Sequence, residues 1–134
     1  MKITVRAVKE NLSSVTGFVD SLLEAACCPP KAQMQIDVAI DEIFSNIARY
    51  AYQDKDGDAA VEVLMTDEPH GVQITFTDSG TPFDPMTTDD PDITLSAEDR
   101  KIGGLGLFIV KKTMDNVFYQ YKNGQNVLTI FKRF

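Results

Sequence analysis

The feature that most constrains the fold is a pair of neighbouring helical patterns in the first third of the sequence. Between residues 9 and 52, apolar side chains recur every three or four positions, which indicates amphipathic helices. Pro29 and Pro30 divide this stretch, because proline interrupts a helix but is tolerated in the first turn of the next one. We therefore predict two helices, over residues 9–27 and 31–52.

Alternation of apolar and polar residues predicts the strands. It covers residues 2–7, 60–66, 72–78, 117–121 and 127–131, and a further helical pattern covers residues 105–114. Residues 67–71 predict a hairpin with a longer loop, whereas Asn123-Gly124 is typical of a tight hairpin turn. Hairpins combined with helices predict an α+β fold, a two-layer α/β sandwich. Its mixed, mainly antiparallel sheet would carry helices on one face.

Length and charge narrow the classes of function. A chain of 134 residues suits a single domain, residues 1–134. The net charge of -7 argues against direct binding to nucleic acid or to a membrane surface, because both are anionic. A nucleotide remains compatible, since a metal ion and backbone amides can offset its charge locally. Adjacent cysteines rarely form a disulfide, and no apolar run is long enough to span a membrane, so we expect a cytoplasmic protein.

Three short stretches carry residues with chemistry, and the first lies on the second predicted helix. Glu42 and Asn46 are four positions apart and therefore share one helix face. That face borders the apolar stripe, where a carboxylate and an amide need partners. An amide oxygen can bind Mg²⁺, and a carboxylate can take a proton from a hydroxyl. Taken alone, the pair is more typical of a solvated helix edge.

The second stretch, Asp78-Ser79-Gly80, follows an apolar strand. An ionised carboxylate can accept a hydrogen bond from the exocyclic amine of adenine, whereas guanine offers an oxygen at that ring position. Gly80 would let the backbone pass close to a flat ring. Taken alone, the stretch is more typical of an ordinary turn after a strand.

The third stretch, Gly103-Gly104-Leu105-Gly106, opens a predicted helix. Glycines at a helix N-terminus expose backbone amides that can bind phosphate, although a flexible hinge would show the same residues. The stretch is neither a Walker A loop nor a Rossmann fingerprint. The long polar segment between the second and third stretches, about residues 79–104, is typical of a lid that closes over a ligand.

In combination, the three stretches resemble the GHKL ATPase superfamily, which includes histidine kinases and type II topoisomerases. Residues 42–46 are similar to its N box, residues 78–80 to its first glycine box and residues 103–106 to its second. The resemblance covers nearly the whole chain and implies the Bergerat ATP-binding fold. Through residues 46–52, 78–85 and 103–112, the chain is most similar to the small stand-alone anti-sigma factors that are also serine kinases.

The resemblance implies a role for each matching residue. Glu42 would act as the base toward a serine hydroxyl, Asn46 would bind Mg²⁺ and Asp78 would hold the adenine amine. The other implied ATP-binding residues are Arg49, Gly80, Pro82, Phe83, Gly103, Gly104, Leu105, Gly106 and Leu107. Ile47 and Tyr50 depart from the family pattern, which often has alanine and histidine at these positions.

The function that the resemblance implies is an ATP-dependent protein serine/threonine kinase. It would be an anti-sigma factor that binds a sigma factor and phosphorylates an anti-sigma-factor antagonist, and some members of the family work as homodimers. Two alternatives remain. In one, ATP only orders the lid so that a partner can dock. In the other, the chain is a detached histidine-kinase-type ATPase domain, but His70 is the only histidine and falls between two predicted strands.

Overall fold

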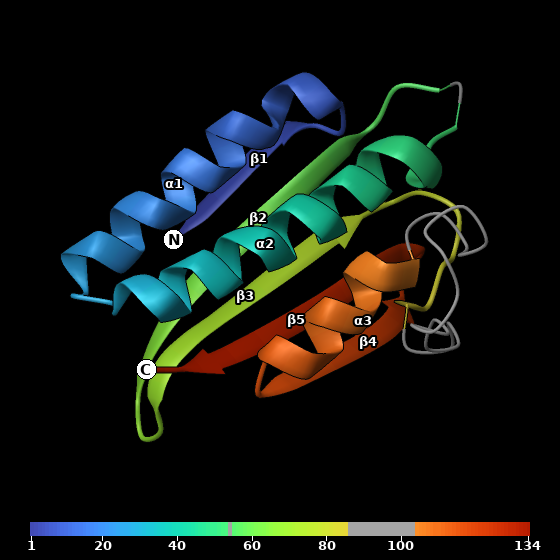
Figure 1. Ribbon diagram of the computed structural model, residues 1–134. Coiled ribbons are helices and arrows are strands. Elements are labelled where there is room, and N and C mark those ends of the chain that lie inside the picture. Colours follow the sequence, from blue (N-terminus) through green and yellow to red (C-terminus); the bar gives the residue numbers. More distant parts are fainter. Residues whose placement is uncertain (54, 86–103) are drawn as a thin grey trace.

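The computed structural model describes residues 1–53, 55–85 and 104–134, and its framework is an antiparallel five-stranded sheet (Figure 1). The strands are β1 (Lys2–Arg6), β2 (Asp58–Asp67), β3 (His70–Asp78), β4 (Asn116–Lys122) and β5 (Gln125–Arg133). Their order across the sheet is β1-β2-β3-β5-β4. Each pairing of the described strands is antiparallel, so this sheet is not mixed. The predicted two-layer α+β fold is confirmed.

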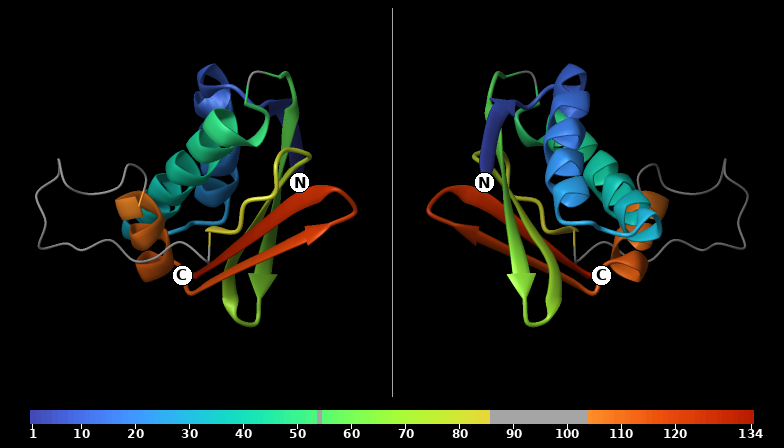
Figure 2. Two further views of the ribbon diagram at one scale, coloured as in Figure 1. Left: turned by 90° about the vertical axis from the view of Figure 1, so that its right-hand side faces the viewer. Right: turned by 90° about the vertical axis from the view of Figure 1, so that its left-hand side faces the viewer.

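Three helices, α1 (Leu12–Ala25), α2 (Pro30–Asn46) and α3 (Gly104–Thr113), lie on one face of the sheet (Figure 2). The first is shorter than predicted, because residues 9–11 form a 3₁₀ turn and Cys27 has a positive φ of 59° just beyond its C-terminus. The second starts at Pro30, one residue before the predicted start, and its α-helical part ends at Asn46, where a π-helical turn over Ile47–Ala51 follows.

The β2–β3 hairpin is tighter than predicted. Asp67 pairs with His70, so a two-residue turn replaces the expected longer loop, and that prediction is wrong. Backbone pairing continues beyond the apolar alternation, because a strand needs only backbone donors and acceptors to extend. The Thr66 hydroxyl supports the turn by donating to the carbonyl oxygen of Pro69 at 2.6 Å.

The core lies between the helices and the sheet. Its fully buried side chains come from every layer: Val15, Val19 and Leu23 of α1, Ile36, Ile40 and Phe44 of α2, and Val61, Ile74, Phe76 and Ile130 of the sheet. Burying one such side chain contributes about 1.5–3 kcal/mol. The helix α2 packs against both α1 and α3, so its position over the sheet is fixed on two sides. In the part of the chain that the structure describes, no helix has the length and apolar character of a membrane span.

Two carboxyl groups face each other between α1 and α2. Asp20 and Asp37 each bury one carboxylate oxygen, Oδ1, that has no hydrogen-bond donor among the described residues. Two ionised carboxylates cannot donate to each other, so the contact becomes a hydrogen bond only when they share a proton. Burial, followed by the hydrogen bond and charge of Asp20, raises the pKa of Asp37 from 3.8 to about 7.

We predict that Asp37→Asn stabilises the protein above neutral pH. The folded chain holds this proton up to about pH 7, while the unfolded chain releases it near pH 3.8. Folding stability therefore falls as pH rises between these values, and the contribution is lost above pH 7. Solvent screens the pair in part, so the expected gain at pH 8 is about 1 kcal/mol, or roughly 3–5 °C in Tm.

The measurement is thermal unfolding of both proteins from pH 4 to pH 9. Asp41→Asn is the matched control, because it removes the same charge from an exposed position of the same helix. Equal pH dependence in the wild-type chain and Asp37→Asn would contradict a shared proton between α1 and α2.

Candidate functional site

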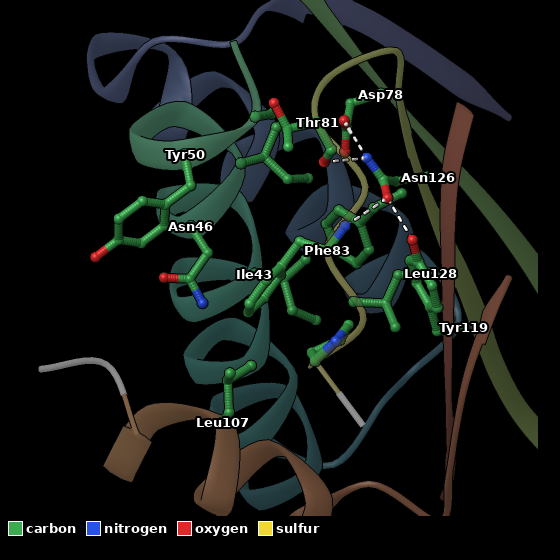
Figure 3. Close-up of a pocket in the computed structure, with 14 residues that line it drawn as sticks. Ile43, Asn46, Tyr50, Asp78, Thr81, Phe83, Leu107, Tyr119, Asn126 and Leu128 are labelled. Atoms are coloured by element: carbon green, nitrogen blue, oxygen red, sulfur yellow. Dashed lines mark hydrogen bonds between the residues drawn. The ribbon is translucent and has the colours of Figure 1, made fainter. Parts of the chain in front are cut away.

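A cleft opens between α2, the start of α3 and the adjoining ends of β3 and β5 (Figure 3). It contains about 490 Å³ of space, its open mouth included. Its lining residues are Ile43, Asn46, Ile47, Tyr50, Ala51, Phe76, Asp78, Thr81, Phe83, Pro85, Leu107, Tyr119, Asn126 and Leu128. Most of this surface is apolar, and a small number of polar groups project into it, which is the usual character of a small-molecule site.

One wall of the cleft is the polar edge of α2. The Asn46 amide donates from Nδ2 to Glu42 Oε1 at 3.3 Å, and both side chains are half-buried. This bond leaves Asn46 Oδ1 as an acceptor for a ligand or an ion. Burial raises the pKa of the Glu42 carboxyl, and the Asn46 hydrogen bond and the Arg49 charge partly offset that rise. The two residues thus share one helix face, as predicted, and in addition form a hydrogen bond with each other.

The first turn of α3 lies directly against Glu42. A Cβ atom built on Gly106 would collide with the Glu42 carboxylate, so a larger residue here would require the Glu42 side chain to move. The N-terminal turn of a helix also carries unpaired backbone amides and a partial positive charge. The structure therefore places Glu42 of the first predicted stretch beside Gly106 of the third, about 60 residues apart in sequence.

Asp78 lies at the opposite end of the cleft. It continues the core-facing row of β3 after Val72, Ile74 and Phe76, and it is only 5% exposed. Its Oδ1 accepts from the backbone amide of Gly80 at 2.9 Å and from Asn126 Nδ2 at 3.0 Å. Because these donors both contact Oδ1, Oδ2 can accept a hydrogen bond from a ligand.

The π-helical turn after α2 joins these two ends. It directs the carbonyl of Ala51 toward the segment after β3, where Thr81 donates its backbone amide at 2.7 Å. A Cβ atom on Gly80 would overlap this Ala51 carbonyl. The sequence predicts glycine at position 80 for the approach of a flat ring, whereas the structure shows another reason for it, which is the close approach of two backbones.

Sequence reasoning missed the residues that complete the Asp78 end of the cleft. Asn126 is the direct cross-strand neighbour of Asp78 and is 6% exposed, and Tyr119 on β4 donates its hydroxyl to Asn126 Oδ1. One signal could have found Asn126. It takes the place of an apolar residue in the alternating row that continues with Leu128 and Ile130.

The other predicted residues are distributed unevenly around the cleft. Phe83 and Leu107 line it, whereas Pro82 and Arg49 are exposed and do not. The Arg49 guanidinium instead lies over the Tyr50 ring at 5.6 Å. Gly104 and Leu105 lie in the first turn of α3. Gly103 and most of the predicted lid, about 79–104, lie outside the described residues.

We predict that Gly80→Ala destabilises the protein by about 1–3 kcal/mol, because the new methyl group forces the Ala51 and Thr81 backbones apart. Chemical denaturation measures this loss. The matched control is Gly17→Ala on α1, where the new Cβ meets nothing within 4 Å. That change should stabilise by about 0.5–1 kcal/mol, as expected for glycine within a helix. A Gly80→Ala variant as stable as the wild-type chain would contradict the close approach.

Comparison with known proteins gives matches over nearly the whole chain. Residues 5–132 match the histidine kinase-like ATPase domain. The serine-protein kinase RsbW of Listeria monocytogenes is 32% identical over 98 residues, which cover 69% of this chain and 61% of that protein. The serine/threonine-protein kinase BtrW of Bordetella bronchiseptica is 26% identical over 100 residues, which cover 75% and 70%. The chain thus spans about three-fifths of the Listeria relative's length.

Proposed function

Because the chain belongs to the histidine kinase-like ATPase domain family, we propose that it binds ATP in the cleft and transfers the γ-phosphoryl group to a serine of a partner protein. One observation carries the proposal. Asp78 Oδ2, which accepts no hydrogen bond from the described residues, lies at one end of an apolar cleft, and the Glu42–Asn46 pair lies beside the start of α3 at the other. This arrangement matches the two ends of a nucleotide, its base and its phosphates.

The Asp78 end suits adenine. Oδ2 can accept from the exocyclic amine of the base, while Phe76 and Leu128 offer apolar surface to the ring. Guanine would direct its carbonyl oxygen at the carboxylate and leave both acceptors without a donor. Phe83 and Leu107 extend the apolar lining toward the mouth of the cleft.

The α3 end suits phosphates. Backbone amides in the first turn of a helix that starts at Gly104 favour an anion. The acceptor Asn46 Oδ1 fits Mg²⁺, an ion that takes most of its ligands from water and phosphate and only one or two from protein. When bound, Mg²⁺ would neutralise charge on the phosphates. The described residues contain no group of three or more His, Cys, Asp or Glu side chains that could hold a metal by themselves.

Glu42 is the residue that we propose as the base. Its carboxylate is held in place by the Asn46 amide and lies against Gly106, at the phosphate end. A base in this position can orient a serine hydroxyl and accept its proton as the oxygen attacks phosphorus. The raised pKa, caused mainly by burial, makes Glu42 a stronger proton acceptor than a solvated carboxylate.

The same proposal extends to partners. The resemblance to anti-sigma-factor kinases favours a sigma factor and an antagonist protein as the bound partners, and a homodimer as the working form. A pull-down from the native organism with and without ATP and Mg²⁺, read by mass spectrometry, would identify them. Nucleotide-dependent capture without any phosphoprotein would favour a binding module in which ATP acts only as a conformational ligand.

The structure gives no support to a phosphoaccepting histidine. His70 lies at the opposite end of β3 from Asp78, and its ring packs edge-on against Phe134 with centroids 5.0 Å apart. A strand of nine residues separates the two ends by roughly 30 Å. His70 is therefore too far from the cleft to receive a phosphoryl group there.

We predict that Glu42→Ala lowers phosphoryl transfer by at least about 100-fold while ATP still binds, because the variant loses the base but keeps the Asp78 end. Transfer is measured with γ-labelled ATP and the partner that the pull-down recovers. Glu62→Ala is the control, since it removes an exposed carboxylate from the other face of the sheet. Undiminished transfer in Glu42→Ala would exclude Glu42 as the base.

We further predict that Asp78→Asn weakens ATP binding by about 10–100-fold and relaxes discrimination against GTP. The amide can present a donor to the guanine carbonyl, which the carboxylate cannot. Calorimetry with both nucleotides measures the change, and Thr77→Val, on the neighbouring residue of β3, is the control. Unchanged affinity for ATP would show that Asp78 does not hold the adenine amine.

A further inference from the structure

Asn126 is a buried amide whose hydrogen-bonding capacity is fully used inside the protein. Its Nδ2 donates to Asp78 Oδ1 at 3.0 Å and to the Thr81 carbonyl at 3.0 Å (Figure 3). Its Oδ1 accepts from the Phe83 backbone amide at 3.1 Å and from the Tyr119 hydroxyl. An asparagine side chain has two donors and two acceptor sites, so these four contacts leave no group for a ligand.

The four contacts join two parts of the cleft. One part is Asp78 at the end of β3, and the other is the chain from Thr81 to Phe83, which forms a wall of the same cleft. In sequence, Thr81 lies 45 residues from Asn126 and Asp78 lies 48 residues from it. A single side chain on β5 therefore fixes both the carboxylate and the wall beside it.

Tyr119 and Phe83 determine which way the amide faces. Both donate to Oδ1. In the opposite orientation Nδ2 would face the Phe83 amide, which can only donate, Oδ1 would face the Asp78 carboxylate, and the Tyr119 hydroxyl would have to become an acceptor. Burial raises the pKa of the Tyr119 phenol, and the charges of Asp84 and Asp78 act in the same direction, so the hydroxyl remains a donor at neutral pH. The donor to Asp78 is thus set by a residue on a neighbouring strand.

We propose that Asn126 is a positioning residue for base recognition. It occupies Asp78 Oδ1, holds the carboxylate in one rotamer and so directs Oδ2 at the exocyclic amine of adenine. Tyr119 supports this role by fixing the orientation of the Asn126 amide. The inference rests on the proposed function, because it requires Asp78 to be the group that reads the base.

The test compares ATP with inosine triphosphate, which has a carbonyl in place of the exocyclic amine. Binding of each nucleotide with Mg²⁺ is measured by calorimetry for the wild-type chain, Asn126→Leu and Tyr119→Phe. Asn126→Leu keeps the side-chain size but removes every hydrogen bond. We expect a loss of about 10–100-fold in ATP affinity and a change of less than ~3-fold for inosine triphosphate, so the ratio of the two affinities falls at least about tenfold.

A purely structural role would give another result. If Asn126 only supported the cleft wall, both affinities would fall together and their ratio would stay at the wild-type value, which would overturn the proposal. An unchanged affinity for both nucleotides would overturn it as well. Thr129→Val is the matched control, since Thr129 lies on the same strand and its hydroxyl contacts Thr75, at 3.3 Å, on the other face of the sheet.

Tyr119→Phe decides the question if Asn126→Leu does not fold, because it removes one donor to the amide and keeps the ring. A fall of about threefold or more in the affinity ratio supports the proposal, and an unchanged ratio overturns it. Asp78→Asn separates this inference from the proposed function. If Asp78→Asn leaves the ratio unchanged, the assignment of the adenine site fails; if only that variant lowers it, the role of Asn126 alone fails.

Discussion

The structure depends on the burial of one face of α2 against the sheet. Ile36, Ile40 and Phe44 are fully buried there, while Glu42 and Asn46 occupy the strip beside them. The hydrophobic free energy that fixes the helix therefore also fixes its polar pair. A rotation by one residue position would expose Phe44 or bury the Glu42 carboxylate without a partner, and either change costs several kcal/mol. The geometry of the cleft is a consequence of core packing on this side.

The sheet forms the other side of the cleft, and core packing fixes the polar residues of that side as well. The core-facing rows of β3 and β5 run from apolar residues into Asp78 and Asn126, which are direct neighbours across the two strands. A buried carboxylate is costly unless hydrogen bonds satisfy it, and the amide supplies one at a position that the strand register fixes. The candidate site is thus a polar edge of the core. It forms where the core-facing rows of β3 and β5 continue from apolar residues to polar ones.

The sequence predicts those features that depend on local periodicity. Helices and strands follow from spacings of 3.6 and 2. Gly80 stands where two backbones approach closely, and Gly106 stands where α3 meets the Glu42 carboxylate. The π-helical turn was not predictable, because the cleft segment that receives the Ala51 carbonyl is about 30 residues away. Asn126 was not predicted as a site residue for a related reason. The alternating row marks Asn126 only as a polar residue at a buried position; its role follows once strand pairing places it beside Asp78, and no local pattern shows that pairing.

The negative charge of the chain constrains how the cleft could bind a phosphate. The chain carries a net charge of -7, and Glu42 already places a carboxylate against the first turn of α3. A phosphate bound by the same helix turn would bring a second anion to that point, and the two would repel each other strongly in a partly buried site. Arg49 lies close enough to influence Glu42, but it is not among the lining residues, and its exposed guanidinium lies over the ring of Tyr50. Under the proposed function, a cation that enters with the nucleotide would offset this repulsion, and Asn46, a neutral amide beside Glu42, could bind it without adding to the negative charge.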